Sequence, residues 1–87
     1  MSMSVEWTPA AVKDMRRITE RDRGRIIAKI DQYAQDPASL ANQIVAMTGS
    51  SYRRLRVGRY RVIIDIQRDT ATVMVIMRVR HRRAAYG

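Results

Sequence analysis

The chain has 87 residues, 46% of them hydrophobic, and its 17 Lys and Arg side chains outnumber its 8 Asp and Glu side chains to give a net charge of +9. This length predicts one domain, residues 1–87, with a modest core. No cysteine is present, which excludes disulfides and thiolate metal sites and leads us to expect a cytoplasmic protein. No apolar run approaches the roughly 20 residues of a membrane span, and no secretory signal is visible at the N-terminus, so we expect no membrane association.

The positive charge is concentrated in the second half of the chain. Residues 50–87 hold ten arginines and two acids, whereas residues 1–49 hold seven basic and six acidic side chains. Arginine accounts for 15 of the 17 basic residues, and its planar fork binds phosphate groups bidentately. This distribution favours RNA or another phosphate-rich partner. The alternatives are a solvated basic face and a face that docks an acidic protein.

The first segment predicts a short strand followed by a helix. Val5 and Trp7 flank Glu6 in the alternation of a strand. Thr8 and Pro9 are typical of an N-cap and of the first helical position. Apolar residues then recur at helical spacing at Ala11, Val12, Met15 and Ile18.

A second helix is predicted to follow directly. Thr19 and Asp22 have the spacing of a capping box, and Asp36-Pro37 is expected to end the helix. Its apolar stripe consists of Ile26, Ile27, Ile30, Tyr33 and Ala34. We expect residues 37–51 to be irregular. Three apolar residues of that segment are expected to pack on the core, namely Leu40, Ile44 and Met47.

The remainder predicts a three-stranded antiparallel meander. A two-residue turn at Gly58-Arg59 would set the pairs Val57–Tyr60, Arg56–Arg61, Leu55–Val62 and Arg54–Ile63. Alternation then gives a core face made of Leu55, Val57, Tyr60, Val62, Ile64 and Ile66. The fold class is therefore α+β: an N-terminal strand, a two-helix hairpin and a meander that forms a twisted sheet with the helices on one face.

The third strand of the meander is placed by a second turn. With Asp69-Thr70 as that turn, four core residues of the middle strand pair with Val73, Val75, Met77 and Val79. Arg78 would then lie beside Arg61, on the same face as Arg54 and Arg56. Like charges opposite each other across strands are destabilising, and only Asp65 is nearby to offset them. We therefore expect an anionic partner, the alternative being a solvated face whose side chains splay apart.

Two blocks of the sequence resemble the RelE/ParE toxin superfamily of type II toxin–antitoxin systems. The first is YRRLRVGRYRVII at residues 52–64, and the second is VRHRRAAY at residues 79–86. The resemblance covers nearly the whole chain. The predicted strand, helix hairpin and meander also follow one another in the order found in that superfamily. The resemblance implies a compact α+β toxin, with the fold named above. The RelE branch cleaves messenger RNA in the ribosomal A site, whereas the ParE branch poisons DNA gyrase.

The resemblance to RelE implies roles for individual residues. It places a basic residue of the second strand at Arg54, a transition-state arginine at Arg61 and the arginine that follows the last strand at Arg82. The C-terminal tyrosine that stacks on or activates the substrate falls at Tyr86, and His81 stands where many relatives have histidine. Five further arginines are expected to contact RNA or to remain solvated: Arg53, Arg56, Arg78, Arg80 and Arg83.

The implied reaction is attack of a 2′-OH on the adjacent phosphate, which requires a base, an acid and stabilisation of the phosphoryl oxygens. Well-known RelE proteins carry lysines on the second strand, one of them a candidate base, where this chain has arginine. Because arginine stays protonated, Arg54 is a poor base. His81 is the first candidate for acid or base and Tyr86 the second. The alternatives are a structural hydrogen bond for His81, which alternation points to the core face, and a core-capping role for Tyr86. No metal-ligand spacing is present, so we expect neither metal nor cofactor.

Three functions follow from the resemblance. The leading one is a ribosome-dependent endoribonuclease that acts on mRNA, is neutralised by an acidic cognate antitoxin and contacts operator DNA only through that antitoxin. The second is a gyrase inhibitor that acts by binding. The third is a folded but inactive toxin, because the lysine base is missing.

Overall fold

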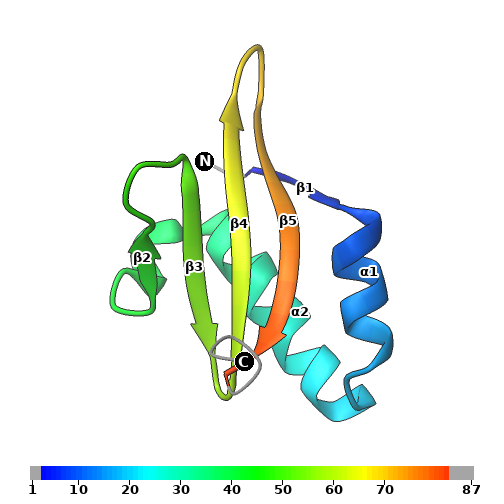
Figure 1. The fold of residues 1–87 in the computed structure, drawn as a ribbon. Coiled ribbons are helices and arrows are strands. Elements are labelled where there is room, and N and C mark those ends of the chain that lie inside the picture. Colours follow the sequence, from blue (N-terminus) through cyan, green and yellow to red (C-terminus); the bar gives the residue numbers. More distant parts are fainter. Residues whose placement is uncertain (1–2, 83–87) are drawn as a thin grey trace.

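The computed structural model describes residues 3–82 and has two helices packed against a five-stranded sheet (Figure 1). The strand order is β1-β5-β4-β3-β2. The elements are β1 (Ser4–Trp7), α1 (Pro9–Arg16), α2 (Glu20–Gln35), a 3₁₀ turn (Pro37–Leu40), β2 (Ile44–Ala46), β3 (Tyr52–Val57), β4 (Tyr60–Arg68) and β5 (Thr72–His81). The expected α+β class is confirmed. In the described part of the chain, no helix is long and apolar enough to cross a bilayer.

Both helices begin at the residues that the sequence predicts. The Thr8 hydroxyl accepts a hydrogen bond from the Ala11 N–H at 3.1 Å, and Pro9 follows as the first helical residue. At the second helix, the Thr19 hydroxyl accepts from the Asp22 N–H at 3.3 Å. These oxygens satisfy N–H groups that have no partner within the first helical turn. The capping signals therefore fix where α1 and α2 start.

The segment after α2 is more ordered than expected. The helix ends at Gln35, before Asp36-Pro37, as predicted. However, the expectation of an irregular segment over residues 37–51 is wrong for Ile44–Ala46, which form β2 and pair antiparallel with β3. Leu40 is buried and Ile44 packs against the core. A three-residue edge strand is too short to show a periodic pattern, so sequence alternation could not reveal it.

The β3–β4 hairpin has the predicted register throughout. Val57 pairs with Tyr60 and Arg56 with Arg61, across a turn formed by Gly58 and Arg59. Gly58 has φ = +56°, a conformation that glycine adopts without steric cost. Because this turn fixes the register, the side chains of Leu55 and Val62 fall on the same face as the helices.

The predicted β4–β5 register is wrong. The loop contains three residues, Asp69 to Ala71, and Arg68 pairs with Thr72. One extra residue, Met77, lies between the partners of Ile64 and Ile63, as in a β-bulge. As a result the buried side chains of β5 are Met74, Ile76 and Val79. Val73, Val75 and Met77, which were expected on the core face, are only half-buried.

β1 completes the sheet by pairing in parallel with β5, from Ser4 opposite Val73 to Trp7 opposite Ile76. The next residue, Thr8, extends this contact: its N–H donates to the Ile76 carbonyl at 3.1 Å, and its hydroxyl lies 2.9 Å from both the Ile76 and Met77 carbonyls. The start of α1 is therefore attached to the bulge in β5.

The core lies between the helices and the face of the sheet that they cover, which we call the inner face. The buried cluster joins both helices to the strands and includes Ala11, Met15, Ile26, Ile30, Tyr33, Leu55, Val62, Ile64, Met74 and Ile76. The opposite face of the sheet, which we call the outer face, carries the alternate residues of β3 and β4. The outer face is where the candidate site lies.

Candidate functional site

Three arginines stand side by side across the outer face. Arg56 of β3 is directly opposite Arg61 of β4, and Arg61 is directly opposite Arg80 of β5. We call these three residues the arginine row. Arg56 and Arg80 are exposed and Arg61 is half-buried. Arg54 is two residues before Arg56 on β3, so it faces the same way. Two predicted catalytic residues, Arg54 and Arg61, and two predicted RNA contacts thus share one face.

The acid expected to offset this charge is engaged with neutral groups. Asp65, also on the outer face of β4, accepts a hydrogen bond from the Ser51 hydroxyl at 2.6 Å and one from the Gln67 amide at 3.4 Å. Guanidinium groups directly opposite each other repel, which costs stability. The arrangement therefore gives a face suited to multidentate binding of an anion such as a phosphodiester.

The prediction that Arg78 lies beside Arg61 is wrong, because Arg78 pairs with Ile63. Its guanidinium forms a two-point ion pair with Asp14 of α1, with Nε at 2.8 Å and the second contact at 3.0 Å. The same carboxylate accepts the Val79 N–H at 2.9 Å. The Arg78 hydrogen bonds, aided by that N–H, hold the pKa of Asp14 below its usual value despite partial burial, and Asp14 in turn raises the pKa of Arg78. A role of Arg78 in RNA binding stays a prediction.

His81 lies on the inner face, the position that alternation predicts. It pairs with Tyr60, and the two rings meet edge to face with centroids 5.3 Å apart. The Tyr60 hydroxyl donates to the Asp22 carboxylate of α2 at 3.2 Å. Burial, together with this hydrogen bond, raises the pKa of Tyr60. His81 is therefore separated by the sheet from the arginine row, and its catalytic role stays a prediction.

The remaining predicted residues are divided between other locations. Arg53 points to the inner face, where it donates to the Tyr33 hydroxyl at 3.1 Å. Arg82 is exposed at the end of β5, and its N–H donates to the Arg59 carbonyl at 2.6 Å, beside the β3–β4 turn. The predictions for Arg83 and Tyr86 fall outside the described residues.

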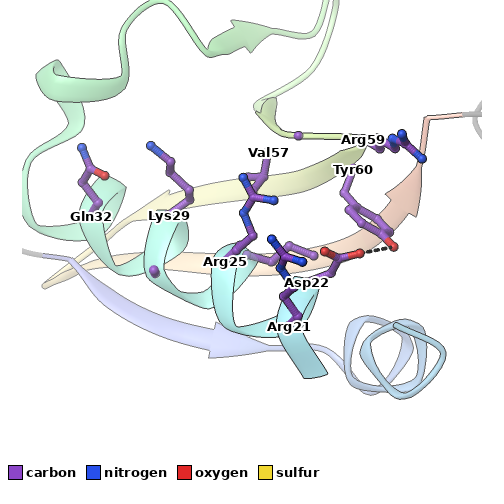
Figure 2. A pocket seen from close by; sticks show the side chains of 11 residues that line it. Arg21, Asp22, Arg25, Lys29, Gln32, Val57, Arg59 and Tyr60 are labelled. Atoms are coloured by element: carbon purple, nitrogen blue, oxygen red, sulfur yellow. Dashed lines mark hydrogen bonds between the residues drawn. The ribbon is translucent and has the colours of Figure 1, made fainter. Parts of the chain in front are cut away.

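The structure also contains a basic groove that the sequence did not lead us to expect. The groove has a volume of about 650 Å³ and lies between α2 and the β3–β4 turn. Figure 2 shows Arg21, Arg25 and Lys29 on successive turns of α2, with Arg59 on the other wall. Asp22 also lines the groove, but its carboxylate is bound by Tyr60. The i, i+4, i+8 spacing of the three cations was the available signal, because such residues share one helix face.

The described residues offer no obvious place for a metal ion. Within residues 3–82, no three His, Asp or Glu side chains are grouped so that they could hold one. The arginine row itself offers guanidinium groups, which bind anions and stabilise negative charge that develops on them.

Solved structures with the same fold come from toxin–antitoxin systems. The toxin–antitoxin complex RelBE2 of Mycobacterium tuberculosis matches with a TM-score of 0.76 and 23% identity, over 94% of this chain and 100% of that chain. The RelB–RelE complex of Methanococcus jannaschii matches with a TM-score of 0.74 and 28% identity, over 93% and 94%. A mutant of the E. coli toxin RelE in the free state matches with a TM-score of 0.78 and 16% identity, over 99% and 90%.

Sequence comparison gives the family directly. No curated protein matches the chain. A family model described as the ParE toxin of the type II toxin–antitoxin system, parDE, matches residues 5–86, which is nearly the whole chain. Together with the helix hairpin, the meander and the fold shared with RelE, this match shows that the chain belongs to the RelE/ParE superfamily of type II toxins.

Proposed function

We propose that this toxin is a ribosome-dependent endoribonuclease that binds mRNA on the outer face of its sheet and cleaves it without a metal. The observation that carries the proposal is the arginine row, in which Arg56, Arg61 and Arg80 occupy directly opposed positions on three adjacent strands. An arrangement that costs stability in the isolated protein becomes favourable when a phosphodiester lies across it.

In this mechanism the 2′-oxygen of the RNA attacks the neighbouring phosphorus, the bond to the 5′-oxygen breaks, and a 2′,3′-cyclic phosphate forms. A base accepts the 2′-OH proton and an acid protonates the departing 5′-oxygen. Arg61, in the middle of the row, stabilises the charge that develops on the phosphoryl oxygens, assisted by Arg54 and Arg82. Because His81 lies on the inner face against Tyr60, we assign proton transfer to Tyr86 ahead of His81. Positioning of the nucleotide in line for attack is left to the ribosome.

We further propose that an acidic segment of a cognate antitoxin occupies the groove beside α2. The support is charge complementarity: Arg21, Arg25, Lys29 and Arg59 line the groove, and Ile26 and Val57 give it an apolar floor. The solved relatives from M. tuberculosis and M. jannaschii are complexes of a toxin with its antitoxin. Contact with operator DNA then occurs only through the antitoxin.

The proposal is tested by inducing the protein in cells and following labelled methionine and labelled thymidine. A ribosome-dependent nuclease stops methionine incorporation first, and mRNA 5′ ends accumulate at positions inside ribosome-protected fragments. Purified toxin with programmed ribosomes, assayed with the Mg²⁺ that keeps ribosomes assembled, should give the same cuts and leave 2′,3′-cyclic phosphate ends. Intact mRNA in both assays would overturn the proposal.

A gyrase inhibitor is the second candidate, and two observations favour it. The matching family model is that of ParE toxins, and His81, the first candidate for acid or base, lies on the inner face against Tyr60 and not beside the arginine row. In that case thymidine incorporation fails before methionine incorporation, and covalent gyrase–DNA complexes accumulate. If both methionine and thymidine incorporation continue, the protein is an inactive toxin.

A further inference from the structure

The bulge in β5 decides which residues join the arginine row. Before the bulge, Ile76 pairs with Ile64 on the inner face, and after it Arg78 pairs with Ile63 and Arg80 with Arg61. Strict alternation from Ile76 would have placed Arg78 and Arg80 on the inner face. The extra residue, Met77, reverses the alternation. Without it, the register of Ile64 and Ile76 would continue and Val79, not Arg80, would lie opposite Arg61.

Two residues of the α1 segment hold this bulge, the N-cap residue Thr8 and Asp14 of the last turn. Thr8 binds the carbonyls of Ile76 and Met77, both at 2.9 Å. Asp14 binds the residues on the other side of the bulge, through the Arg78 guanidinium at 2.8 Å and the Val79 N–H at 2.9 Å. Since β1 ends opposite Ile76, no strand among residues 3–82 lies on this edge to accept the Val79 N–H. The Asp14 carboxylate takes the place of the missing strand.

Local helix energetics do not account for an acid at position 14. Asp14 lies in the last turn of α1, which ends at Arg16, where the helix dipole disfavours a negative charge. Aspartate is also a weak helix former. Its side chain is only 13% exposed and is fully engaged with β5. The benefit of the acid therefore lies in the tertiary contact.

We propose that Asp14 is a positioning residue for the arginine row: by fixing the bulge at Met77 it holds Arg80 on the outer face opposite Arg61. The inference rests on the proposed function of that row for its consequence in activity, but its geometric part can be tested independently. Asp14 touches no substrate in this scheme and acts through β5.

The absence of cysteine allows a geometric test by disulfide trapping. The double variant R61C/R80C should form a disulfide, because directly opposed residues of an antiparallel pair have suitable Cβ separation. Adding Asp14→Ala should slow its formation about tenfold, since a buried N–H then loses a charged acceptor. Adding Asp14→Asn should slow it much less, because the amide oxygen can still accept the Val79 N–H. The matched control is Q67C/V73C, a pair on the far side of the bulge that should form equally fast in all backgrounds.

The same Asp14 variants also test for a shifted register. With Asp14→Ala, the disulfide of R61C/V79C should form faster while that of R61C/R80C forms more slowly. If R61C/R80C forms as fast with Asp14→Ala as with Asp14, the proposal is wrong. Amide exchange on the unmodified protein provides a test that needs no variant: the Val79 amide should be strongly protected, and rapid exchange would contradict the proposal.

Activity is measured separately, as cleavage rate per folded molecule on programmed ribosomes. Asp14→Ala should lower this rate about tenfold, with recovery in Asp14→Asn. Ile30→Val serves as a control of comparable stability loss, because Ile30 is buried in α2, and it should leave the rate per folded molecule unchanged. If Asp14→Ala slows disulfide formation but the protein with Asp14 cleaves no RNA, the proposed nuclease is refuted and the positioning role stands. If Asp14→Ala leaves the rate of disulfide formation unchanged and the protein with Asp14 cleaves RNA, only the positioning role is refuted.

Discussion

The inner and outer faces of the same strands carry different kinds of information. On β3, Arg56 stands between Leu55 and Val57, and on β4, Arg61 stands between Tyr60 and Val62. The inner residues Leu55 and Val62 are completely buried, whereas Arg56 is exposed. The comparison teaches that core packing and the proposed anion binding are encoded by alternate residues of one strand. Substitutions one position apart should therefore separate the two properties.

The largest expected effect is on stability, from the inner face. Ile64→Ala should lower the free energy of unfolding by about 2–5 kcal/mol, because Ile64 is completely buried and truncation leaves a cavity. The measurement is urea denaturation followed by circular dichroism. Ile63→Ala, one position away and half-buried on the outer face, should cost clearly less. Equal losses for the two variants would contradict the division between the faces.

The next effect is on activity, from the outer face. Arg61→Ala should lower RNA cleavage by about 10²–10³-fold, since it removes the central charge that stabilises the phosphoryl oxygens. The variant should remain folded, as judged by circular dichroism. Arg82→Ala should also abolish toxicity while leaving the fold intact. Arg68→Ala is the control, because Arg68 lies opposite Thr72 at the other end of β4. Full toxicity of both the Arg61 and the Arg82 variant would show that the site is misassigned.

Acid should weaken the contact between α1 and β5. Asp14 has a pKa below its usual 3.8 in the folded protein, so its contribution is complete above the unfolded-state pKa and is lost as the pH falls through the lower folded value. The difference in unfolding free energy between the protein and its Asp14→Asn variant should be on the order of 1 kcal/mol at pH 7. It should shrink below about pH 4. Urea titrations of both proteins from pH 2 to pH 7 measure it, and a difference that is constant with pH would contradict the assignment.

The smallest effect has the opposite sign. Arg56→Gln should raise the free energy of unfolding by about 0.2–1 kcal/mol at low salt, because it relieves the repulsion with Arg61. The gain should disappear near 1 M salt, where the Debye length is about 3 Å. Arg68→Gln, with threonine opposite, should show no such gain. Denaturation at low and high salt gives both values, and a loss of stability in Arg56→Gln would show that repulsion is not the controlling interaction.

Local signals allowed much of the fold to be predicted from the sequence. Thr8 and Thr19 mark the helix starts through short-range hydrogen bonds. Gly58 fixes the β3–β4 hairpin, so the opposition of Arg56 and Arg61 followed from the sequence. In each case the determining residue is within a few positions of the element that it controls, and a sequence pattern records such information directly.

The register of β5 could not be predicted in the same way. Residues 73–77, Val-Met-Val-Ile-Met, are all apolar, so they show no alternation from which to choose a face. The choice depends on the bulge, and the bulge depends on Asp14, more than 60 residues earlier in the chain. The sequence therefore placed Arg78, instead of Arg80, beside Arg61. The groove was missed for a related reason: α2 supplies one wall and the β3–β4 turn the other.

The parallel pairing of β1 with β5 has a consequence for how the toxin is made. The contacts between Thr8 and Ile76 join residues that are 68 positions apart, so the first strand has no partner until the last one has been synthesised. Contacts so distant in sequence form slowly. Arg80 belongs to that same last strand, so closing the sheet and completing the row of guanidinium groups are a single event. A nascent chain that lacks β5 is therefore unfinished as a domain and lacks one residue of the proposed site.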